Sequence, residues 1–331
     1  MTKEFLINEK IFVAGGHGMV GSAIIRELKK RKHINKEQIF SPSHADLDLE
    51  NINKVTDWFN KNKPTIVIIA AAKVGGILAN NSYPADFLIK NLKIQTNLIE
   101  TAYQFGIKKL IFLGSSCIYP KFAEQPLKEE SLLTGKLEDT NEAYAIAKIA
   151  GIKLCSALRK QYNFDALSLM PTNLYGQGDN YHPDDSHVMA ALIRKFNDAK
   201  KFSSKKVVCW GDGSPLREFM HVDDLAKAVL HVLEFWDLNS NEAPKDANGE
   251  FLNYLNVGTG KEISIKKLAE KVATKFEYLG EIEWDLSKPN GTPRKLLNIE
   301  KIRSLGWEPK ISLNEGLNST IKDYLARESS I

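Results

Sequence analysis

The sequence lacks the features of an extracellular or membrane-bound protein. Its three cysteines (Cys117, Cys155 and Cys209) are an odd number without Cys-x-x-Cys spacing, which argues against a disulfide framework and against a zinc site. The most apolar stretch, 66–72, stops at Lys73 and falls far short of the ~20 residues that a membrane helix needs. The N-terminal residues contain no apolar core long enough for a signal peptide. We therefore expect a cytoplasmic protein with no membrane partner.

An excess of charge of either sign is also missing. The 331 residues include 45 Lys and Arg against 41 Asp and Glu, a formal net charge of +4, and 43% are hydrophobic. Nucleic-acid binders usually carry a concentrated basic face, and no basic run stands out here. We therefore expect no nucleic-acid partner, although a local cluster matched to a diphosphate stays possible. The length predicts one large domain or two smaller ones.

Short apolar runs alternate with longer helical patterns in the first half of the chain. The expected strands are 10–14, 38–41, 65–70, 109–114 and 166–170. The expected helices between them are 19–32, 53–60, 84–105 and 144–162. Strands and helices that alternate at this spacing indicate parallel strands joined by crossovers. The sequence therefore predicts an α/β fold with a Rossmann-type doubly wound parallel sheet.

The second half of the chain follows this pattern less clearly. We expect a helix ending near residue 199, a strand at 207–210, a helix at 222–234, a polar surface excursion at 237–250 and a loop at 256–260. Ligands of open α/β sheets bind at the carboxyl edge of the strands. We therefore expect a smaller C-terminal α/β substrate-binding domain over that edge. The predicted division is 1–175, with a return segment at about 218–258, against 176–217 and 259–331.

A glycine-rich turn follows the first expected strand and opens the first helix. Glycines at this place permit a tight turn and let backbone N–H groups approach a pyrophosphate, which a helix N-terminus also favours. A plain turn is the alternative, but the position between a strand and a helix favours dinucleotide binding. The predicted contacts at this turn are Gly15, Gly18, Met19, Val20 and Gly21.

The end of the second strand bears on the choice between NAD and NADP. An acidic side chain there would bind the ribose 2′-hydroxyl and repel a 2′-phosphate. This chain instead has Ser41, Ser43 and His44, with no carboxylate before Asp46. These residues favour NADP.

Tyr144 and Lys148 place a phenol and an ammonium group on one face of an expected helix. A free Tyr has a pKa of ~10, and we expect the neighbouring cation to lower it into a range useful for acid catalysis. The alternative is a surface pair on an amphipathic helix. Ser115 and Ser116 follow a strand and can hydrogen-bond a substrate carbonyl, and Asn91 is a candidate for ordering a relay water.

The order of these motifs resembles that of the extended short-chain dehydrogenases. More narrowly, four segments are similar to the GDP-L-fucose synthase family: 71–76, 114–120, 171–176 and 211–219. The resemblance covers nearly the whole chain. It implies an NADPH-dependent enzyme that epimerises GDP-4-keto-6-deoxymannose at C3 and C5 and then reduces C4. It also implies a homodimer formed through helices 84–105 and 144–162, and further NADP contacts from Ala71, Ala72, Lys148, Pro171, Asn173 and Leu174.

The resemblance also assigns the catalytic roles. Protons on C3 and C5 are acidic because both carbons flank the ketone, and epimerisation needs a base on one face and an acid on the other. Cys117 is then the base and His187 the acid, with Tyr144, Ser115 and Lys148 around the ketone oxygen. A Cys pKa of ~8.5 needs only a modest depression by neighbouring cations. The alternatives are a packed cysteine and a helix-capping or core histidine.

For the substrate, the resemblance places Lys195, Trp210 and Arg217 around the GDP diphosphate and base, and Asn290 near the sugar or guanosine. Lys and Arg suit a diphosphate, and Arg can bind it bidentately. Further predicted substrate contacts are Ser116, Asn173 and His187, and Arg294 and Lys295 are either candidates or part of a solvated basic loop.

Several alternatives remain open at this point. A metal site at His182, His187, Asp184 and Asp185 is conceivable, but the family that the chain resembles needs no metal. A near functional alternative is a C4 reductase of another GDP-4-keto sugar, such as a 6-deoxy-heptose, without epimerase activity. More distant ones are a sugar 4-epimerase or dehydratase that holds NAD permanently, and a non-catalytic dinucleotide-sensing scaffold.

Overall fold

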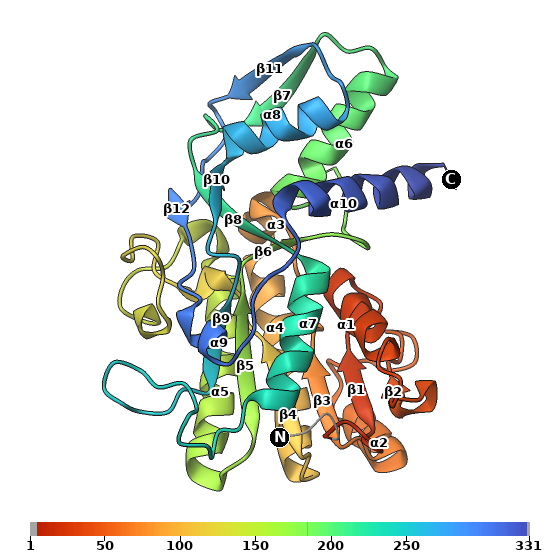
Figure 1. The fold of residues 1–331 in the computed structure, drawn as a ribbon, viewed down its shortest axis with the longest axis vertical. Helices are drawn as coiled ribbons and strands as arrows, with labels where there is room; N and C mark the ends of the chain where they lie inside the picture. The colour runs from red at the N-terminus through yellow and green to blue at the C-terminus, as the bar shows by residue number, and fades with distance from the viewer. Residues whose placement is uncertain (1–4, 184, 330–331) are drawn as a thin grey trace.

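The computed structural model describes residues 5–183 and 185–329. Within these residues the chain forms a six-stranded parallel sheet in the order β2-β1-β3-β4-β5-β9 (Figure 1). Its strands are β1 (Ile11–Ala14), β2 (Ile39–Phe40), β3 (Ile66–Ile69), β4 (Lys109–Leu113), β5 (Ala166–Pro171) and β9 (Tyr254–Val257). The chain runs from β1 to β2 on one side and then crosses to β3 on the other, so the strand order reverses beside β1. The predicted doubly wound sheet is confirmed, and the crevice at the reversal is where such sheets bind ligands.

Helices cover both faces of this sheet. Contacts between helices place α1 (Met19–Lys29) beside α7 (Val222–Phe235), and α4 (Pro84–Gln104) beside α5 (Glu142–Tyr162) and α2 (Ile52–Asn62). Because both faces are covered, the residues of β1, β3, β4 and β5 are buried throughout, including the polar Lys109 of β4 and Ser168 of β5. These strands and helices share one hydrophobic cluster.

A second, smaller part lies at the carboxyl end of the sheet (Figure 1). It contains the parallel pair β7 (Lys206–Trp210) and β11 (Glu281–Asp285), with α6 (Val188–Lys201), α8 (Ile265–Lys275) and α10 (Leu313–Glu328). These elements share a separate hydrophobic cluster. Between the two parts lie four short strands: β6 (Asn173–Tyr175), β8 (Leu216–His221), β10 (Glu262–Ser264) and β12 (Arg294–Lys295). The remaining helices are α3 (Ile77–Ser82) and α9 (Glu300–Ser304).

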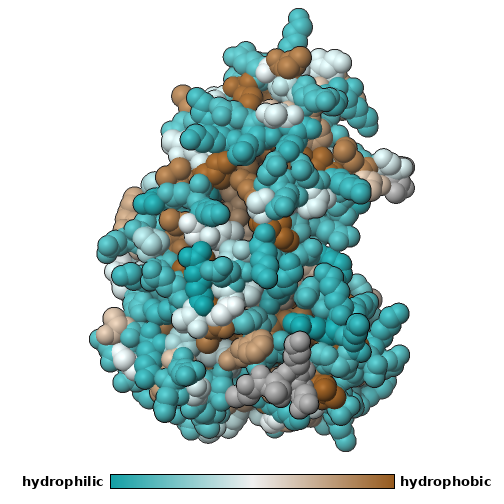
Figure 2. All heavy atoms as spheres, viewed as in Figure 1, coloured by the Kyte–Doolittle hydropathy of each residue, from teal (hydrophilic) through white to brown (hydrophobic). Residues whose placement is uncertain are grey.

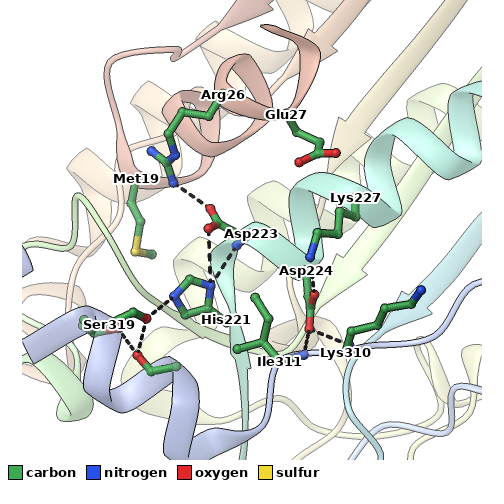
Figure 3. A network of polar contacts seen from close by, with 12 residues as sticks. Met19, Arg26, Glu27, His221, Asp223, Asp224, Lys227, Lys310, Ile311 and Ser319 are labelled. Carbon is green, nitrogen blue, oxygen red and sulfur yellow. Dashed lines mark hydrogen bonds and ion pairs between the residues drawn. The ribbon is translucent and has the colours of Figure 1, made fainter. Parts of the chain in front are cut away.

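Polar contacts at the start of α7 join three helices (Figure 3). Arg26 of α1 forms an ion pair of 2.7 Å with Asp223 of α7. The His221 ring accepts from the Asp223 backbone N–H at 3.2 Å and lies 3.3 Å from the Ser319 hydroxyl of α10. Asp224 accepts from two backbone N–H groups, those of Lys310 and Ile311, at 2.8 and 2.7 Å. The C-terminal segment is thereby tied to the helix that starts at the glycine turn.

One predicted loop is wrong. The first two residues of 256–260 belong to β9, the sixth strand of the sheet. The polar side chain of Asn256 interrupts the apolar pattern by which a buried strand is predicted. In the structure this side chain is wholly buried and hydrogen-bonded to Tyr119, Leu127 and Asn298. A buried amide with these partners is compatible with an interior strand.

The surface in the view of Figure 1 is mostly hydrophilic, with hydrophobic residues in small groups, several of them near the junction of the two parts (Figure 2). In the part of the chain that the structure describes, none of the helices combines the length and apolarity that a bilayer span requires.

Candidate active site

The glycine turn forms an open cradle between β1 and α1. Gly15 has a φ of +82°, which favours glycine, and its position adjoins the Ala71 backbone after β3. A side chain at Gly21 would strike the backbone of Gly15, so the helix can start this close to the turn only with glycine there. Gly18 is exposed and precedes the first helical residue, Met19. The free N–H groups of a helix start suit a diphosphate, so this turn fits the predicted dinucleotide.

The segment after β2 forms the rim of this cradle. The Ser41 hydroxyl is buried and has no hydrogen-bond partner among the described residues, and the Ser41 carbonyl oxygen lies 3.2 Å from the His17 ring. The Ser43 hydroxyl donates to Asp46 at 2.6 Å, which lowers the pKa of that carboxyl. His44 is exposed and lines an open depression. The unpartnered hydroxyl and the exposed imidazole leave donors for a phosphate, while Ser43 is already engaged by a carboxylate.

The other predicted cofactor residues lie at the same sheet edge. Ala71 and Ala72 follow β3, Pro171 ends β5, and Asn173 and Leu174 belong to β6. The Asn173 amide donates to the backbone carbonyl of Glu218 at 2.8 Å, which fixes its side chain. Because carboxyl ends of parallel strands meet at one edge, these residues and the glycine turn border a single crevice.

Lys148 joins the middle of α5 to the end of β4. It is buried, and its ammonium group donates to the Leu113 carbonyl at 2.8 Å. Burial lowers its pKa to about 8. The ammonium nitrogen lies 5.8 Å from the centre of the Tyr144 ring, so the predicted pair shares one helix face.

Tyr144 keeps its proton in this structure. The ring is half-buried and meets Phe87 edge to face at 6.3 Å. Burial, and then the neighbouring Cys117, raise the pKa of Tyr144. The prediction that Lys148 lowers this pKa is therefore wrong: desolvation dominates, and Lys148, whose ammonium group donates to the Leu113 carbonyl, is not among the groups that shift it. A phenol with a raised pKa is suited to donating a proton rather than to accepting one.

Ser115, Ser116 and Cys117 follow β4 at the carboxyl edge of the sheet. The Ser115 hydroxyl accepts from the Cys117 backbone N–H at 3.3 Å. Cys117 is buried, and burial raises the pKa of its thiol, while Lys295, the Ser115 hydroxyl and Lys148 act in the opposite direction. The modest depression of the pKa that Cys117 would need to act as a thiolate is not found, because desolvation exceeds the cationic contributions.

His187 stands immediately before α6. The residue as a whole is exposed, but protein packs around its ring, and this desolvation, followed by Lys295, lowers its pKa. Among the described residues its ring makes no capping hydrogen bond to α6, which disfavours the helix-capping alternative. The backbone N–H of Gly76 donates to the Asp185 carbonyl at 3.0 Å and so supports the loop that carries His187.

The alternative metal site includes Asp184, which lies outside the described residues. Within 5–183 and 185–329, the structure contains no group of three His, Cys, Asp or Glu side chains placed to hold a metal ion.

Four of the predicted substrate residues lie near the short strands of the second part. The Lys195 ammonium donates to the Val208 carbonyl at 2.7 Å and lies 5.6 Å from the centre of the Trp210 ring, which is 46% exposed. Arg217 reaches the Asn290 carbonyl at 3.4 Å, and burial lowers its pKa to about 10. The Lys288 ammonium lies 5.5 Å from the same ring, and an exposed indole beside two cations suits an aromatic base and its phosphates.

A small cavity of about 10 Å³, enough for about one water molecule, extends from Cys117 toward β12. Its charged lining residues are Glu138, Arg294 and Lys295. Arg294 forms an ion pair of 2.8 Å with Glu262 across the strands, so it is not part of a freely solvated loop. Lys295 faces the same cavity as the predicted base.

Two buried polar residues escaped the sequence analysis. The wholly buried Glu218 carboxylate accepts from the backbone N–H groups of Thr259, Gly260 and Leu297, the last two at 2.7 and 2.9 Å. The available signal was the charge of Glu218 itself beside the apolar Phe219 and Met220, since a buried carboxylate needs hydrogen-bond partners. Asn256 is the second of these buried polar residues, and it lies in the segment that was wrongly predicted to be a loop.

Asn91 has a structural role. Its amide oxygen accepts from the Lys73 backbone N–H at 2.9 Å, and its NH₂ group donates to the carbonyls of Lys73 and Phe87. Both donor positions are occupied, so the structure favours anchoring of the Lys73 segment over the expected ordering of a relay water.

The doubly wound sheet, the glycine turn and the Tyr–Lys pair together define a nucleotide-cofactor-dependent enzyme class. The chain belongs to the NAD dependent epimerase/dehydratase family, whose sequence profile matches residues 11–245.

Individual relatives narrow this class. The chain is 54% identical to GDP-L-fucose synthase 1 of Arabidopsis thaliana, over 96% of this chain and 93% of that protein. It is 48% identical to the GDP-L-fucose synthase of Escherichia coli, over 97% and 98%. A solved structure of a GDP-mannoheptose C4 reductase from Campylobacter jejuni with NADP bound is 34% identical, with a TM-score of 0.85 over 96% of this chain and 98% of that one. The resemblance seen in the sequence is confirmed.

Proposed function

We propose that the protein is an NADPH-dependent C4 reductase of a GDP-4-keto-6-deoxy sugar that also epimerises C3 and C5, as a GDP-L-fucose synthase does. One observation carries this proposal: the buried Cys117 thiol lines a cavity at the carboxyl edge of the sheet, the Ser115 hydroxyl accepts from the Cys117 backbone N–H, and the Tyr144 phenol, whose pKa is raised, is a neighbour of the thiol. The identity of 54% to a GDP-L-fucose synthase over nearly the full length supports it.

The residues of the crevice fit NADP. The turn Gly15–Gly21 would hold the diphosphate, and the unpartnered Ser41 hydroxyl with His44 would face the 2′-phosphate. Lys148 would hold the nicotinamide ribose, and the residues after β3 and β5 would line the rest of the cofactor site. When bound, NADPH supplies the hydride that reduces the ketone.

In the reduction, Tyr144 donates a proton to the C4 oxygen while Ser115 donates a hydrogen bond to it. The raised pKa of Tyr144 keeps the donor protonated at neutral pH. The Lys148 cation, with a pKa of about 8, stabilises the phenolate left after transfer.

In the epimerisation, Cys117 removes a proton from the carbon next to the ketone, and His187 returns one on the opposite face. Tyr144 and Ser115 stabilise the enolate oxygen during this step. Epimerisation must precede reduction, because reduction removes the ketone that makes these protons acidic.

The second part of the molecule would hold the GDP moiety. Arg217 and Lys195 pair with the diphosphate, Trp210 stacks on the base, and Asn290 and Ser116 contact the rest of the ligand. We further propose that residues 1–175 with about 218–258 form the NADP-binding domain, and that 176–217 with 259–331 form the nucleotide-sugar-binding domain. The two separate hydrophobic clusters support two domains, but Leu297, Ile299, Ile302 and Trp307 pack in the first cluster rather than in the second.

The direct test supplies GDP-4-keto-6-deoxymannose with NADPH or NADH and identifies the product by NMR. We expect GDP-L-fucose, formed faster with NADPH. A product reduced at C4 with C3 and C5 unchanged would reject the epimerase half. The absence of any coenzyme oxidation across a panel of GDP-4-keto sugars would reject the proposal as a whole.

A C4 reductase of a GDP-linked 6-deoxy-heptose is the second candidate, supported by the likeness to the Campylobacter jejuni enzyme. Incubation with the keto sugar in D₂O without NADPH separates the two. Deuterium at C3 and C5 indicates the bifunctional enzyme, and its absence indicates the simple reductase.

We also propose a homodimer formed through α4 and α5. These helices pack together and leave exposed apolar residues on their outer face, among them Ile89, Ile146 and Tyr162. Sedimentation should show a dimer that Ile146→Glu converts to a monomer; a monomeric native protein would reject this point. The three free thiols suit a reducing compartment, and we propose a cytoplasmic enzyme.

A further inference from the structure

We propose that Lys295 is a positioning residue for the epimerase step, acting as the counter-charge that stabilises the thiolate of Cys117. This inference rests on the proposed function, since it needs Cys117 to act as a base. It goes further by assigning the cation that makes a buried thiol usable.

The geometry starts with the cavity beside Cys117. Charged side chains that line it are Glu138, Arg294 and Lys295. Glu138 forms an ion pair of 2.9 Å with Lys121, and Arg294 one of 2.8 Å with Glu262. Lys295 is the member of this group that forms no ion pair or side-chain hydrogen bond within the described residues. Its ammonium group is therefore free to stabilise an anion that forms in the cavity.

The backbone that carries Lys295 is held on both sides. The next residue, Leu296, donates its backbone N–H to Gln125 at 2.9 Å and accepts from the Leu127 backbone N–H at 2.7 Å. The following N–H, that of Leu297, donates to the buried Glu218 carboxylate at 2.9 Å. On the β8 side, Lys295 is in register with Arg217. Lys295 is thus placed by a rigid strand rather than by a surface loop.

The surroundings of Cys117 show why such a cation is needed. Burial raises the pKa of the thiol, and among the groups that act against this effect Lys295 comes first, followed by the Ser115 hydroxyl and Lys148. Lys148 already donates to the Leu113 carbonyl, which limits its contribution.

The other titratable and charged groups around the cavity complete the electrostatic setting. Tyr144 lies beside the thiol on α5 and is protonated, and His187 lies near Lys295 at the start of α6. Burial has the largest effect on the pKa of Lys295 and lowers it. Arg217 also lowers this pKa, and Glu138 raises it.

The chemical step is a proton transfer. The Cys117 thiol first loses its proton to solvent, and the thiolate is paired with the Lys295 ammonium. A C–H bond next to the ketone then breaks, an S–H bond forms on Cys117, and the electron pair moves onto the ketone oxygen as an enolate. Lys295 keeps its proton throughout.

The test measures the Cys117 thiol in the full-length protein without substrate. The rate of iodoacetamide alkylation at Cys117 is followed by mass spectrometry against pH, with the thiolate absorbance near 240 nm, taken as the difference from Cys117→Ser, as a second readout. In Lys295→Met we expect the curve to move to higher pH and the rate at neutral pH to fall about tenfold, since an opposite charge nearby favours the ionised thiol.

Two variants serve as matched controls. Lys295→Arg should restore the curve, and Arg294→Met should leave it unchanged, because that cation lines the same cavity but is already paired with Glu262. Lys295→Met should also slow deuterium incorporation at C3 and C5 by about tenfold, while reduction of an already epimerised substrate changes mainly in KM.

An unchanged alkylation curve and an unchanged difference titration in Lys295→Met would overturn the inference and leave the proposed function intact. Normal deuterium exchange in Cys117→Ser would instead overturn the role of Cys117 in the proposed function. If Lys295→Met does not fold, the same alkylation curve and difference titration are measured on Lys295→Gln. A curve that stays in place in that variant contradicts the inference equally.

Discussion

The two sides of the candidate active site are built in different ways. Lys148 and Tyr144 lie one turn apart on α5, and Lys148 is tied to the end of β4, so this side belongs to consecutive elements of one core. The opposite side brings together Lys295 of β12, Arg217 of β8 and His187 before α6, which are distant in the sequence. Buried polar contacts, above all those of Glu218, hold these segments in place. We infer that the reducing side and Cys117 are set by the core, whereas the other members of the epimerising side are held by a few hydrogen bonds.

The largest effect is expected on the reducing side. Tyr144→Phe removes the proton donor, and we expect kcat for ketone reduction to fall by about 10³-fold, within the range for loss of a general acid. NADPH oxidation monitors the rate. Tyr162→Phe, at the exposed end of the same helix, is the matched control and should stay within about twofold. A Tyr144→Phe variant of normal kcat would remove the basis of the proposed reduction.

Cys117→Ser tests whether the two sides separate. We expect deuterium incorporation at C3 and C5 to fall by about 10²-fold, because a serine hydroxyl is a much weaker base, while an epimerised ketone is still reduced. NMR of the sugar measures the exchange. Cys209→Ser, a change in the core of the second part, serves as the control. Equal losses of exchange and reduction would show that the two sides are not separable.

The pH dependence of reduction follows from Lys148. Its pKa of about 8 means that the ammonium is lost above that pH, and we expect kcat to fall there by about tenfold per pH unit. Lys148→Arg, which keeps its charge, should flatten the decline if it still binds cofactor. For this buried lysine, the unfolded chain holds more protons than the native state between about 8 and 10.5. Its contribution to the free energy of unfolding therefore rises with pH in that window.

Glu218→Gln tests the hydrogen bonds on the epimerising side. A Gln oxygen can replace one acceptor, but its NH₂ group faces a backbone donor, so we expect a loss of about 2–3 kcal/mol in the free energy of unfolding. KM for the nucleotide sugar should rise as well. Urea denaturation and initial rates provide the measurements. Glu283→Gln, in an exposed ion pair with Lys206, should cost about 0.5 kcal/mol or less. Similar costs for the two variants would argue against the importance of Glu218.

The smallest effect on the free energy of unfolding is expected for the ion pair between α1 and α7. Arg26 and Asp223 form an ion pair of 2.7 Å whose side chains are each 31% exposed. A double-mutant cycle with Arg26→Met and Asp223→Asn should give a coupling of about 0.5–1 kcal/mol. A coupling above about 2 kcal/mol would show that polar contacts also dominate on the cofactor side of the molecule.

The same contrast explains how much could be predicted from the sequence. Strands β1 and β3 are wholly apolar, β4 and β5 are mostly apolar, and the Tyr144–Lys148 spacing gives one helix face directly, so these features were predictable. β8 and β9 were missed, because Glu218 and Asn256 are polar residues in buried strands and only tertiary hydrogen bonds compensate them. Local patterns cannot reveal such partners.

The directions in which the pKa values of Tyr144 and Cys117 are shifted also could not be predicted from the sequence. Tyr144 next to Lys148 predicts a lowered phenol pKa, and Cys117 near cations predicts a lowered thiol pKa. Both are raised in the structure, because burial depends on segments that pack over the site from elsewhere in the chain. Lys295 became a clear candidate only when β12 placed it beside the cavity.

The central claim is that both sides of the site act on one sugar ketone. A crystal structure with NADP⁺ and GDP-L-fucose bound tests it most directly. We predict that the sugar O4 lies within about 3.2 Å of the Tyr144 and Ser115 hydroxyls, with Cys117 and His187 on opposite faces of the ring. A sugar bound with O4 turned away from Tyr144, or with Cys117 and His187 on the same face, would contradict the account.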